Sequence, residues 1–217
     1  MKNLEIYIHI PFCVRKCEYC DFLSFPADDD AKLRYVKGIM AEMIFYGPLM
    51  KNYQVSSVYI GGGTPSYIDE QWIAALMEGV FDCFNVLPDA EISIECNPGT
   101  LSREKLLAYR DAGINRLSIG LQSANNDELK LLGRIHTFEQ FVTNYEVARN
   151  VGFKNINVDL MYGLPGQSAS QYMATVNKII RLHPDHISAY SLIVEKGTPF
   201  YEKYKFDMVR QEAGMRT

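Results

Sequence analysis

The sequence predicts an α/β fold in which six parallel strands form a partial (β/α)6 TIM-like barrel. Three observations support this prediction. Six short apolar runs recur along the 217 residues, segments with helical spacing lie between them, and hydrophobic residues make up 47% of the chain, enough for a substantial core. Alternating strands and helices imply a parallel sheet with right-handed crossovers. No linker, repeat or low-complexity stretch indicates a second domain within residues 1–200.

The expected strands share short apolar runs bounded by turn residues. They cover residues 4–10, 57–60, 91–95, 116–122, 155–163 and 186–194. The expected helices cover residues 30–46, 69–84, 102–112, 125–132, 138–150 and 169–182. An aspartate precedes the first helix as a cap, Ser102 caps the third, and Gly113 ends it. The polar tail, 201–217, is expected to be a final helix or a frayed end.

Composition limits the classes of function. The net charge of −4 and the lack of a long basic run argue against a nucleic-acid partner. The N-terminus "MKNLEIYIHIPF" is too short and polar for a secretory signal, and no apolar run approaches about 18 residues. We therefore expect a cytoplasmic protein. Five cysteines, three of them crowded together, suit metal binding better than a disulfide framework.

The first strand runs into Cys13, Cys17 and Cys20, with the spacing C-x3-C-x2-C. Three thiolates on one loop can bind three irons of a cube-shaped iron–sulfur cluster and leave the fourth iron open for a small molecule. Two alternatives stay open: a zinc site with His9 as the fourth ligand, and three buried thiols without metal. Outside this loop, the two remaining cysteines, Cys83 and Cys96, are interpreted as small buried side chains.

The second and third strands end in features suited to a polar ligand. The second ends in "GGGTPS" (61–66), where glycines allow close approach of the backbone to a ligand, or simply a tight turn. This is not the spacing of a dinucleotide or P-loop fingerprint. The third strand ends at Glu95, which can accept hydrogen bonds from an ammonium group or ribose hydroxyls. The alternative for Glu95 is a structural ion pair.

The later strands bring an amide, a cation, a carboxylate and an apolar end. Gln122 ends the fourth strand, and Arg134 follows in "LLGRIHT", as a carboxylate-binding group or a solvated charge. Asp159 lies in an apolar run and needs a ligand or partner, because an unpaired buried carboxylate is costly. Ile193, at the sixth strand end, suits a flat ring such as adenine. Since these strand ends meet at one edge, they predict a ligand site with an amino-acid-like and a nucleoside-like half.

Together these motifs resemble the radical S-adenosylmethionine (SAM) superfamily, in the branch of oxygen-independent coproporphyrinogen III oxidases and HemW-type haem chaperones. The resemblance covers residues 4 to about 200 and depends on "YIHIPFCVRKCEYCDF", "GGGTPS", "IECNPGT", "RLSIGLQS", "LGRIHT", "NVDLMYGLPGQ" and "YSLIVEKGTPF". It implies a partial barrel of the radical SAM type over residues 1–200, followed by a tail at 201–217 in place of the family's usual C-terminal domain.

The resemblance also implies cofactors and their ligands. Cys13, Cys17 and Cys20 would bind a [4Fe–4S] cluster, and SAM would chelate its fourth iron. An electron from the reduced cluster would cleave SAM to methionine and a 5′-deoxyadenosyl radical. The SAM contacts implied by the family are two tyrosines, the glycine loop, four polar side chains and one apolar residue: Tyr7, Tyr19, Gly62, Gly63, Thr64, Glu95, Gln122, Arg134, Asp159 and Ile193. Within this set, the glycine loop would meet the ammonium group of SAM and Arg134 its carboxylate.

The branch is indicated by the cysteine loop. Oxidases of the family resemble C-x3-C-x2-C-x-C and carry a longer N-terminal segment, whereas here Phe22 stands at the fourth cysteine's place and six residues precede Tyr7. This favours a haem chaperone of HemW type, with coproporphyrinogen oxidation as the alternative and a zinc-stabilised binding module as a second.

The expected partners of such a chaperone are SAM, haem or a porphyrin, an electron donor such as a flavodoxin or ferredoxin, and membrane haemoproteins contacted peripherally. Haem needs an axial ligand, and histidine is a common one. The candidates for this role are His9, His136, His183 and His186, each of which is better interpreted as structural.

Overall fold

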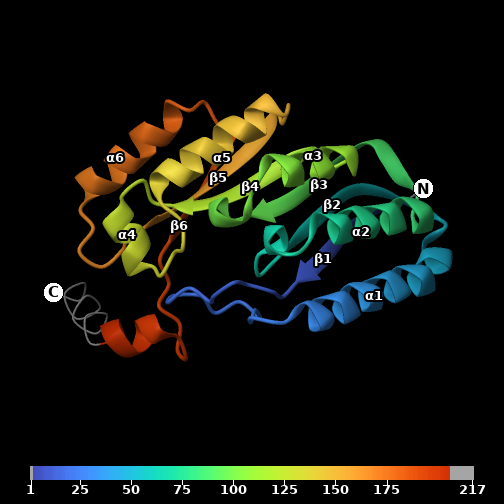
Figure 1. The fold of residues 1–217 in the computed structure, drawn as a ribbon, viewed down its shortest axis with the longest axis horizontal. Coiled ribbons are helices and arrows are strands. Elements are labelled where there is room, and N and C mark those ends of the chain that lie inside the picture. Colours follow the sequence, from blue (N-terminus) through green and yellow to red (C-terminus); the bar gives the residue numbers. More distant parts are fainter. Residues whose placement is uncertain (1, 206–217) are drawn as a thin grey trace.

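The computed structural model of the protein describes residues 2–205. Its centre is one sheet of six strands, all parallel and in the order β1-β2-β3-β4-β5-β6, so that each strand pairs with its neighbours in the chain (Figure 1). The strands are β1 (Lys2–Ile10), β2 (Tyr53–Gly62), β3 (Val86–Cys96), β4 (Arg116–Gln122), β5 (Asn155–Tyr162) and β6 (His186–Ser191). The predicted partial barrel is confirmed.

The predicted helices are also present. They are α1 (Asp29–Tyr46), α2 (Glu70–Cys83), α3 (Arg103–Asp111), α4 (Asn126–Leu131), α5 (Phe138–Asn150) and α6 (Ala169–Ile180). Ser102 caps α3 as expected and accepts a hydrogen bond from the Lys105 amide, whereas α1 begins one residue earlier than predicted, so that its cap is Asp28, which accepts from the Ala31 amide. Asp69 is the N-cap of α2 rather than its first residue, because its carboxylate accepts from the Gln71 amide.

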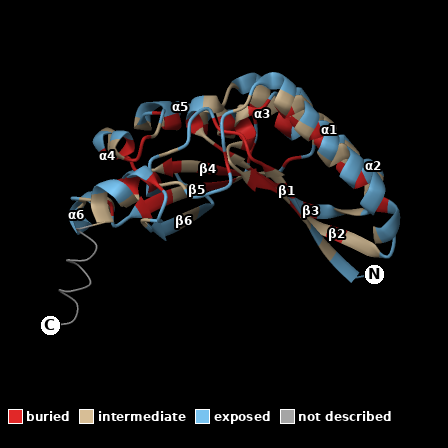
Figure 2. Cartoon of the chain, turned by 90° about the horizontal axis from the view of Figure 1, so that it is seen from below, coloured by how far each residue is buried: buried red, intermediate tan, exposed pale blue. Residues whose placement is uncertain are grey.

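The two faces of the sheet differ because successive strand side chains point to opposite sides. On one face, apolar side chains such as Ile10, Ile60 and Ile94 are fully buried and belong to the main core, which is shared with the helices. The helices lie above the arched sheet in Figure 2 and leave its other face uncovered. This concave face carries polar residues at every second position along the strands, including Tyr59 and Ser118. A ligand can reach the sheet from this face.

The chain after β6 leaves the sheet earlier than predicted. Leu192 and Val194 turn away and join a second apolar cluster whose buried members include Leu132 and Phe200. Residues 199–205 are helical, and the rest of the predicted tail lies outside the described residues. In Figure 1 this red segment lies below the blue loop that follows β1. The second cluster therefore ties the end of the described chain to that loop.

Two further expectations concern burial and membrane crossing. Cys96 is buried as predicted, whereas Cys83 is less buried than predicted, being only partly covered. Cys83 is the last residue of α2 and packs against the main core from its edge. Between residues 2 and 205, no helix combines the length and apolar character needed to span a membrane.

Candidate functional site

The loop that carries the three cysteines is fixed at its base. Phe12 is buried, and its ring contacts the rings of Phe25 and Tyr35 at centroid distances of 5.8 and 5.3 Å. Backbone hydrogen bonds join the two ends of the loop: the Cys13 amide donates to Phe25 O (3.2 Å), and the Phe25 amide donates to Pro11 O (2.9 Å). The first cysteine therefore follows directly from a rigid strand end.

The far side of the cysteine loop is held by two distant segments. The Glu18 amide donates to Leu132 O (3.2 Å), and Arg15 Nη2 donates to Gly133 O (2.8 Å). Gly133 has a φ of +72°, and an added Cβ there would lie 2.9 Å from Glu18 Cγ, so only glycine fits this contact. The Phe200 amide donates to Glu18 O (3.0 Å). The loop thus lies between the turn after α4 and the last described helix.

The three cysteines are free, and two of them contact other candidate residues. Cys13 Sγ lies 3.4 Å from Thr64 Oγ1, and Arg134 Nη1 donates to Cys17 Sγ at 3.6 Å. The pKa of Cys20 is raised, mainly by burial, and the neighbouring thiols of Cys17 and Cys13 add to the increase. The three thiols are therefore electrostatic neighbours, with Cys13 against the glycine loop and Cys17 against Arg134.

The zinc alternative with His9 is not formed in the structure. Both ring nitrogens of His9 have other partners: Nδ1 lies 2.9 Å from the Tyr7 hydroxyl, and Nε2 lies 3.1 Å from Leu23 O. Over residues 2–205, no three His, Cys, Asp or Glu side chains are placed to hold a single metal ion.

The glycine loop after β2 lies directly against the cysteine loop. The Gly63 amide donates to Ile10 O and the Thr64 amide to Phe12 O, both at 2.8 Å. A Cβ on Gly63 would lie 2.9 Å from Phe12 O, and one on Gly62, whose φ is +117°, would lie 2.6 Å from the His9 ring. The close backbone approach predicted for these glycines is therefore made to the chain itself, and it brings Thr64 to Cys13.

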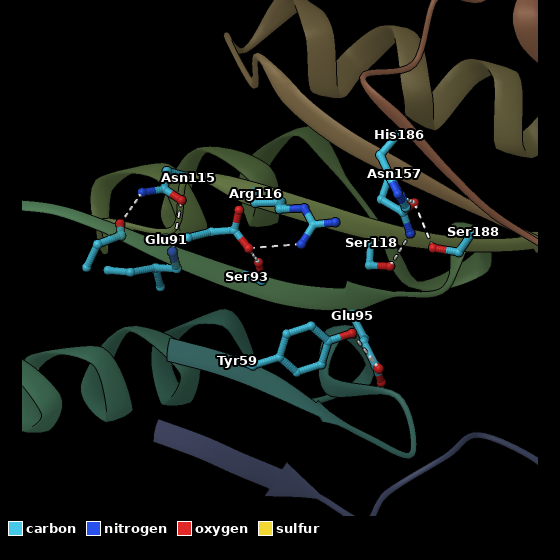
Figure 3. Close-up of polar contacts among 12 residues, drawn as sticks. Tyr59, Glu91, Ser93, Glu95, Asn115, Arg116, Ser118, Asn157, His186 and Ser188 are labelled. Carbon is cyan, nitrogen blue, oxygen red and sulfur yellow. Dashed lines mark hydrogen bonds and ion pairs between the residues drawn. The ribbon is translucent and has the colours of Figure 1, made fainter. Parts of the chain in front are cut away.

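Glu95 is connected to this loop through both carboxylate oxygens. The Tyr59 hydroxyl donates to Oε1 (2.8 Å; Figure 3), and the Gly62 amide donates to Oε2 (3.0 Å). Burial raises the pKa of Glu95, while these two hydrogen bonds act in the opposite direction. No ion pair involves Glu95 among the described residues. Each oxygen keeps a further lone pair for a ligand donor.

Arg134 and Gln122 meet at the end of β4. Arg134 Nη2 donates to Gly120 O (2.6 Å), and a Cβ on Gly120 would lie 3.1 Å from Gln122 Nε2 and 3.3 Å from Arg134 Nη2. Gln122 has a φ of +74° at a break in the strand register. The Nε atom of Arg134 is buried without a hydrogen-bond partner, and the described residues offer Arg134 no carboxylate. Burial lowers the pKa of Arg134, but Tyr19 and Cys17 outweigh it and raise that pKa.

Asp159 already has partners on the concave face. Ser118 Oγ donates to Oδ2 (3.1 Å) and Asn157 Nδ2 donates to Oδ1 (2.7 Å). Asn157 also contacts Ser188 and the His186 ring, as Figure 3 shows. Burial raises the pKa of Asp159, and these hydrogen bonds oppose that increase. The sequence indicated that Asp159 needs a ligand or a partner, and Ser118 and Asn157 are such partners.

The remaining candidates lie at the rim or are structural. Tyr7 pairs with Tyr59 in the β1–β2 register and is 58% exposed, and Ile193 lies two residues beyond β6 and is 63% exposed. Burial raises the pKa of Tyr19 to about 12. His136 is buried with Nε2 3.3 Å from Leu121 O, as suits a structural histidine.

The sequence interpretation missed three polar residues at this site: Tyr59, Ser118 and Asn157. Each alternates with buried apolar neighbours along its strand, so the period of two in β2, β4 and β5 was the signal that could have found them.

Comparison with known proteins decides the family. The model for the Radical SAM superfamily matches residues 7–179. The chain belongs to this superfamily. Among curated relatives of this radical SAM chain, the heme chaperone HemW of Escherichia coli (strain K12) is 38% identical over 203 residues, which are 91% of this chain and 52% of the relative. HemW of Bacillus subtilis (strain 168) is 39% identical over 196 residues, 90% of this chain and 52% of the relative.

A solved structure supports the fold assignment. The coproporphyrinogen III oxidase HemN of Escherichia coli, described as a radical SAM enzyme, superposes with a TM-score of 0.83 at 29% identity, over 94% of this chain and 52% of that one. The radical SAM chain therefore spans about half the length of the relatives that it matches.

Proposed function

We propose that this radical SAM chain binds a [4Fe–4S] cluster and SAM and serves in haem handling of the HemW type. The observation that carries the proposal is that the loop with three free cysteines contacts the glycine loop through Cys13 and contacts, through Cys17, an arginine that has no carboxylate partner among the described residues. This set of groups lies at the carboxyl ends of parallel strands, where ligands of such sheets bind.

The cysteine loop fits a cluster with one open iron. Cys13, Cys17 and Cys20 supply three thiolates for a cluster of four irons, so one iron stays free for a further ligand. Arg134 Nη1 donates to Cys17 Sγ at 3.6 Å, so the loop already directs one of its sulfur atoms toward the group proposed to bind SAM. The three cysteines are therefore proposed as the cluster ligands.

The groups around the loop fit SAM. The Arg134 guanidinium has a buried Nε without a partner and no carboxylate beside it, which suits the carboxylate of the methionine moiety. Gly62, Gly63 and Thr64 are proposed to contact the ammonium group. The other proposed contacts are polar groups for the ribose and rings or apolar side chains at the rim: Glu95, Gln122, Asp159, Tyr7, Tyr19 and Ile193. When bound, the cluster and SAM supply one-electron chemistry that side chains do not provide.

Haem handling is favoured by two observations. The curated relatives described above are named heme chaperones, and Phe22 stands where the oxidase pattern has a fourth cysteine. Phe22 is 69% exposed beside the cysteine loop, so an apolar surface lies where the oxidases have a thiol. The likeness to HemN supports a second candidate, oxidative decarboxylation of coproporphyrinogen III.

Anaerobic reconstitution tests the cofactor part of the proposal. We expect about four irons and four sulfides per chain and an electron paramagnetic resonance signal of the reduced protein that changes when SAM is added. An unchanged signal would refute SAM binding at the cluster. Equimolar zinc without sulfide would support the zinc-stabilised module instead.

Two further assays separate the functions. Haem titrated into the reconstituted protein should give a saturable change in the Soret band, and no change would refute haem handling. Anaerobic incubation with coproporphyrinogen III, SAM and a reductant should give no vinyl product. A vinyl product would establish the oxidase instead.

A further inference from the structure

Tyr59 connects two parts of the site that lie on different strands. It is on the concave face of β2, where its ring stacks beside that of Tyr7 with a centroid distance of 6.2 Å and an interplanar angle of 23°. Its hydroxyl donates to Glu95 Oε1 on β3 at 2.8 Å. The ring and the hydroxyl therefore have separate contacts, and a change that removes only the hydroxyl keeps the ring packing.

Glu95 passes this contact on to the glycine loop. Its second oxygen accepts from the amide of Gly62, a residue whose φ of +117° is open to glycine but rarely to other residues. A carboxylate held at one oxygen has its rotamer restricted, so the Tyr59 bond determines where the other oxygen lies. The position of the Gly62 amide thus depends, through Glu95, on the hydroxyl of Tyr59, which precedes Gly62 on the same strand.

Several ionisable groups face Glu95 from the surrounding strands. Tyr59 lies on β2, Tyr7 and His9 lie on β1, and Asp159 lies on β5. Asp159 acts against ionisation of Glu95 and His9 favours it, while the Tyr59 and Gly62 bonds stabilise the carboxylate. Of these, the Tyr59 hydroxyl and the Gly62 amide are the two groups in direct hydrogen-bond contact with Glu95.

We propose that Tyr59 is a positioning residue of the SAM site: its hydroxyl orients Glu95, and Glu95 holds the Gly62 amide in the conformation that the glycine loop needs for ligand binding. The effect of the Tyr59 hydroxyl on SAM affinity rests on the proposed function, whereas its effect on the conformation of the glycine loop does not. The two are therefore measured separately.

The ligand-independent test follows the Gly62 amide by nuclear magnetic resonance as pH is varied. In the wild type, the amide shift should titrate with Glu95. In Tyr59→Phe the midpoint should move to higher pH, because a bond that favours the carboxylate is lost, and exchange protection of the amide should fall about tenfold. In Glu95→Gln the pH inflection of the Gly62 amide shift should be absent. In the double variant Tyr59→Phe/Glu95→Gln, the shift and the exchange protection of this amide should differ little from those in Glu95→Gln alone. Tyr53→Phe, at the opposite end of β2, is the matched control and should behave as wild type.

The ligand-dependent test measures SAM affinity of the reconstituted protein. Tyr59→Phe should weaken binding about tenfold at neutral pH, and more at acidic pH. An unchanged Gly62 midpoint and unchanged protection in Tyr59→Phe would overturn the inference. If the midpoint shifts in Tyr59→Phe but the reconstituted wild type binds no SAM, the positioning of the loop is supported and the proposed function is refuted.

Discussion

Replacing Gly62 with alanine tests whether the glycine loop needs its conformation and its close packing. Alanine at a φ of +117° is strained, at a cost of order 1–3 kcal/mol. The added Cβ would also lie 2.6 Å from Cε1 and Nδ1 of His9, closer than side chains pack. The ring would have to move and lose its bonds to the Tyr7 hydroxyl and to Leu23 O, each worth about 0.5–1.5 kcal/mol.

The combined destabilisation expected for Gly62→Ala is roughly 2–6 kcal/mol. Two other glycines separate its causes. Gly166 has a φ of +76° and nothing within 4 Å of an added Cβ, so Gly166→Ala should show the backbone strain alone. Gly38, inside α1, has neither feature, so Gly38→Ala should stabilise the protein by about 0.5–1 kcal/mol.

Urea unfolding of the protein without cofactors measures these free energies. The double variant His9→Ala/Gly62→Ala should cost less than the sum of its single changes, because the first removes the ring that the second strikes. If Gly62→Ala costs no more than Gly166→Ala, or if the two changes in the double variant are additive, the clash with His9 is not the cause and the reasoning fails.

The other predictions concern the cysteine loop, Arg134 and His136. Cys17→Ala should abolish retention of iron and sulfide but leave the far-ultraviolet circular dichroism unchanged, because Cys17 lies on a loop and contributes nothing to the main core. Arg134→Gln should weaken SAM binding about 10–100-fold, since a charged hydrogen bond is lost, with partial recovery in Arg134→Lys. Burial, with Arg134 nearby, lowers the pKa of His136 from 6.5 to about 3. The unfolded chain therefore takes up a proton below pH 6.5 that the folded protein does not bind, and stability falls as pH drops toward 3, with a limiting slope of about 1.4 kcal/mol per pH unit. In His136→Asn this part of the slope between pH 7 and 5 should disappear from urea titrations.

Each of these predictions has a contrary result. Cys83→Ala, at the end of α2, should retain the cluster, and loss of the cluster there would show that cysteine removal acts non-specifically. Equal SAM affinity of Arg134→Gln and the wild type would remove Arg134 from the site. A pH slope unchanged by His136→Asn would show that folding does not lower the pKa of this histidine.

The sequence predicted the elements because their signals are local. The cap at Asp28 and the apolar alternation of β4 depend on residues next to one another in the chain, and both elements are present within one residue of the prediction. The end of β6 was predicted three residues too far, because Leu192 and Val194 are apolar whether they lie in a sheet or in the second cluster. The apolar pattern cannot distinguish these two environments.

The sequence alone determined the order of strands and helices, the gathering of the three cysteines on one loop and the presence of glycines beside it, since spacing and strand polarity require only local chemistry. Only the tertiary structure decided which groups touch: that Tyr59 and Gly62 share Glu95, that Arg134 reaches Cys17 across 117 positions of sequence, and that His9 is engaged elsewhere. These contacts join residues from different strands and loops, and their distances follow from how the sheet curves and how the helices pack on it.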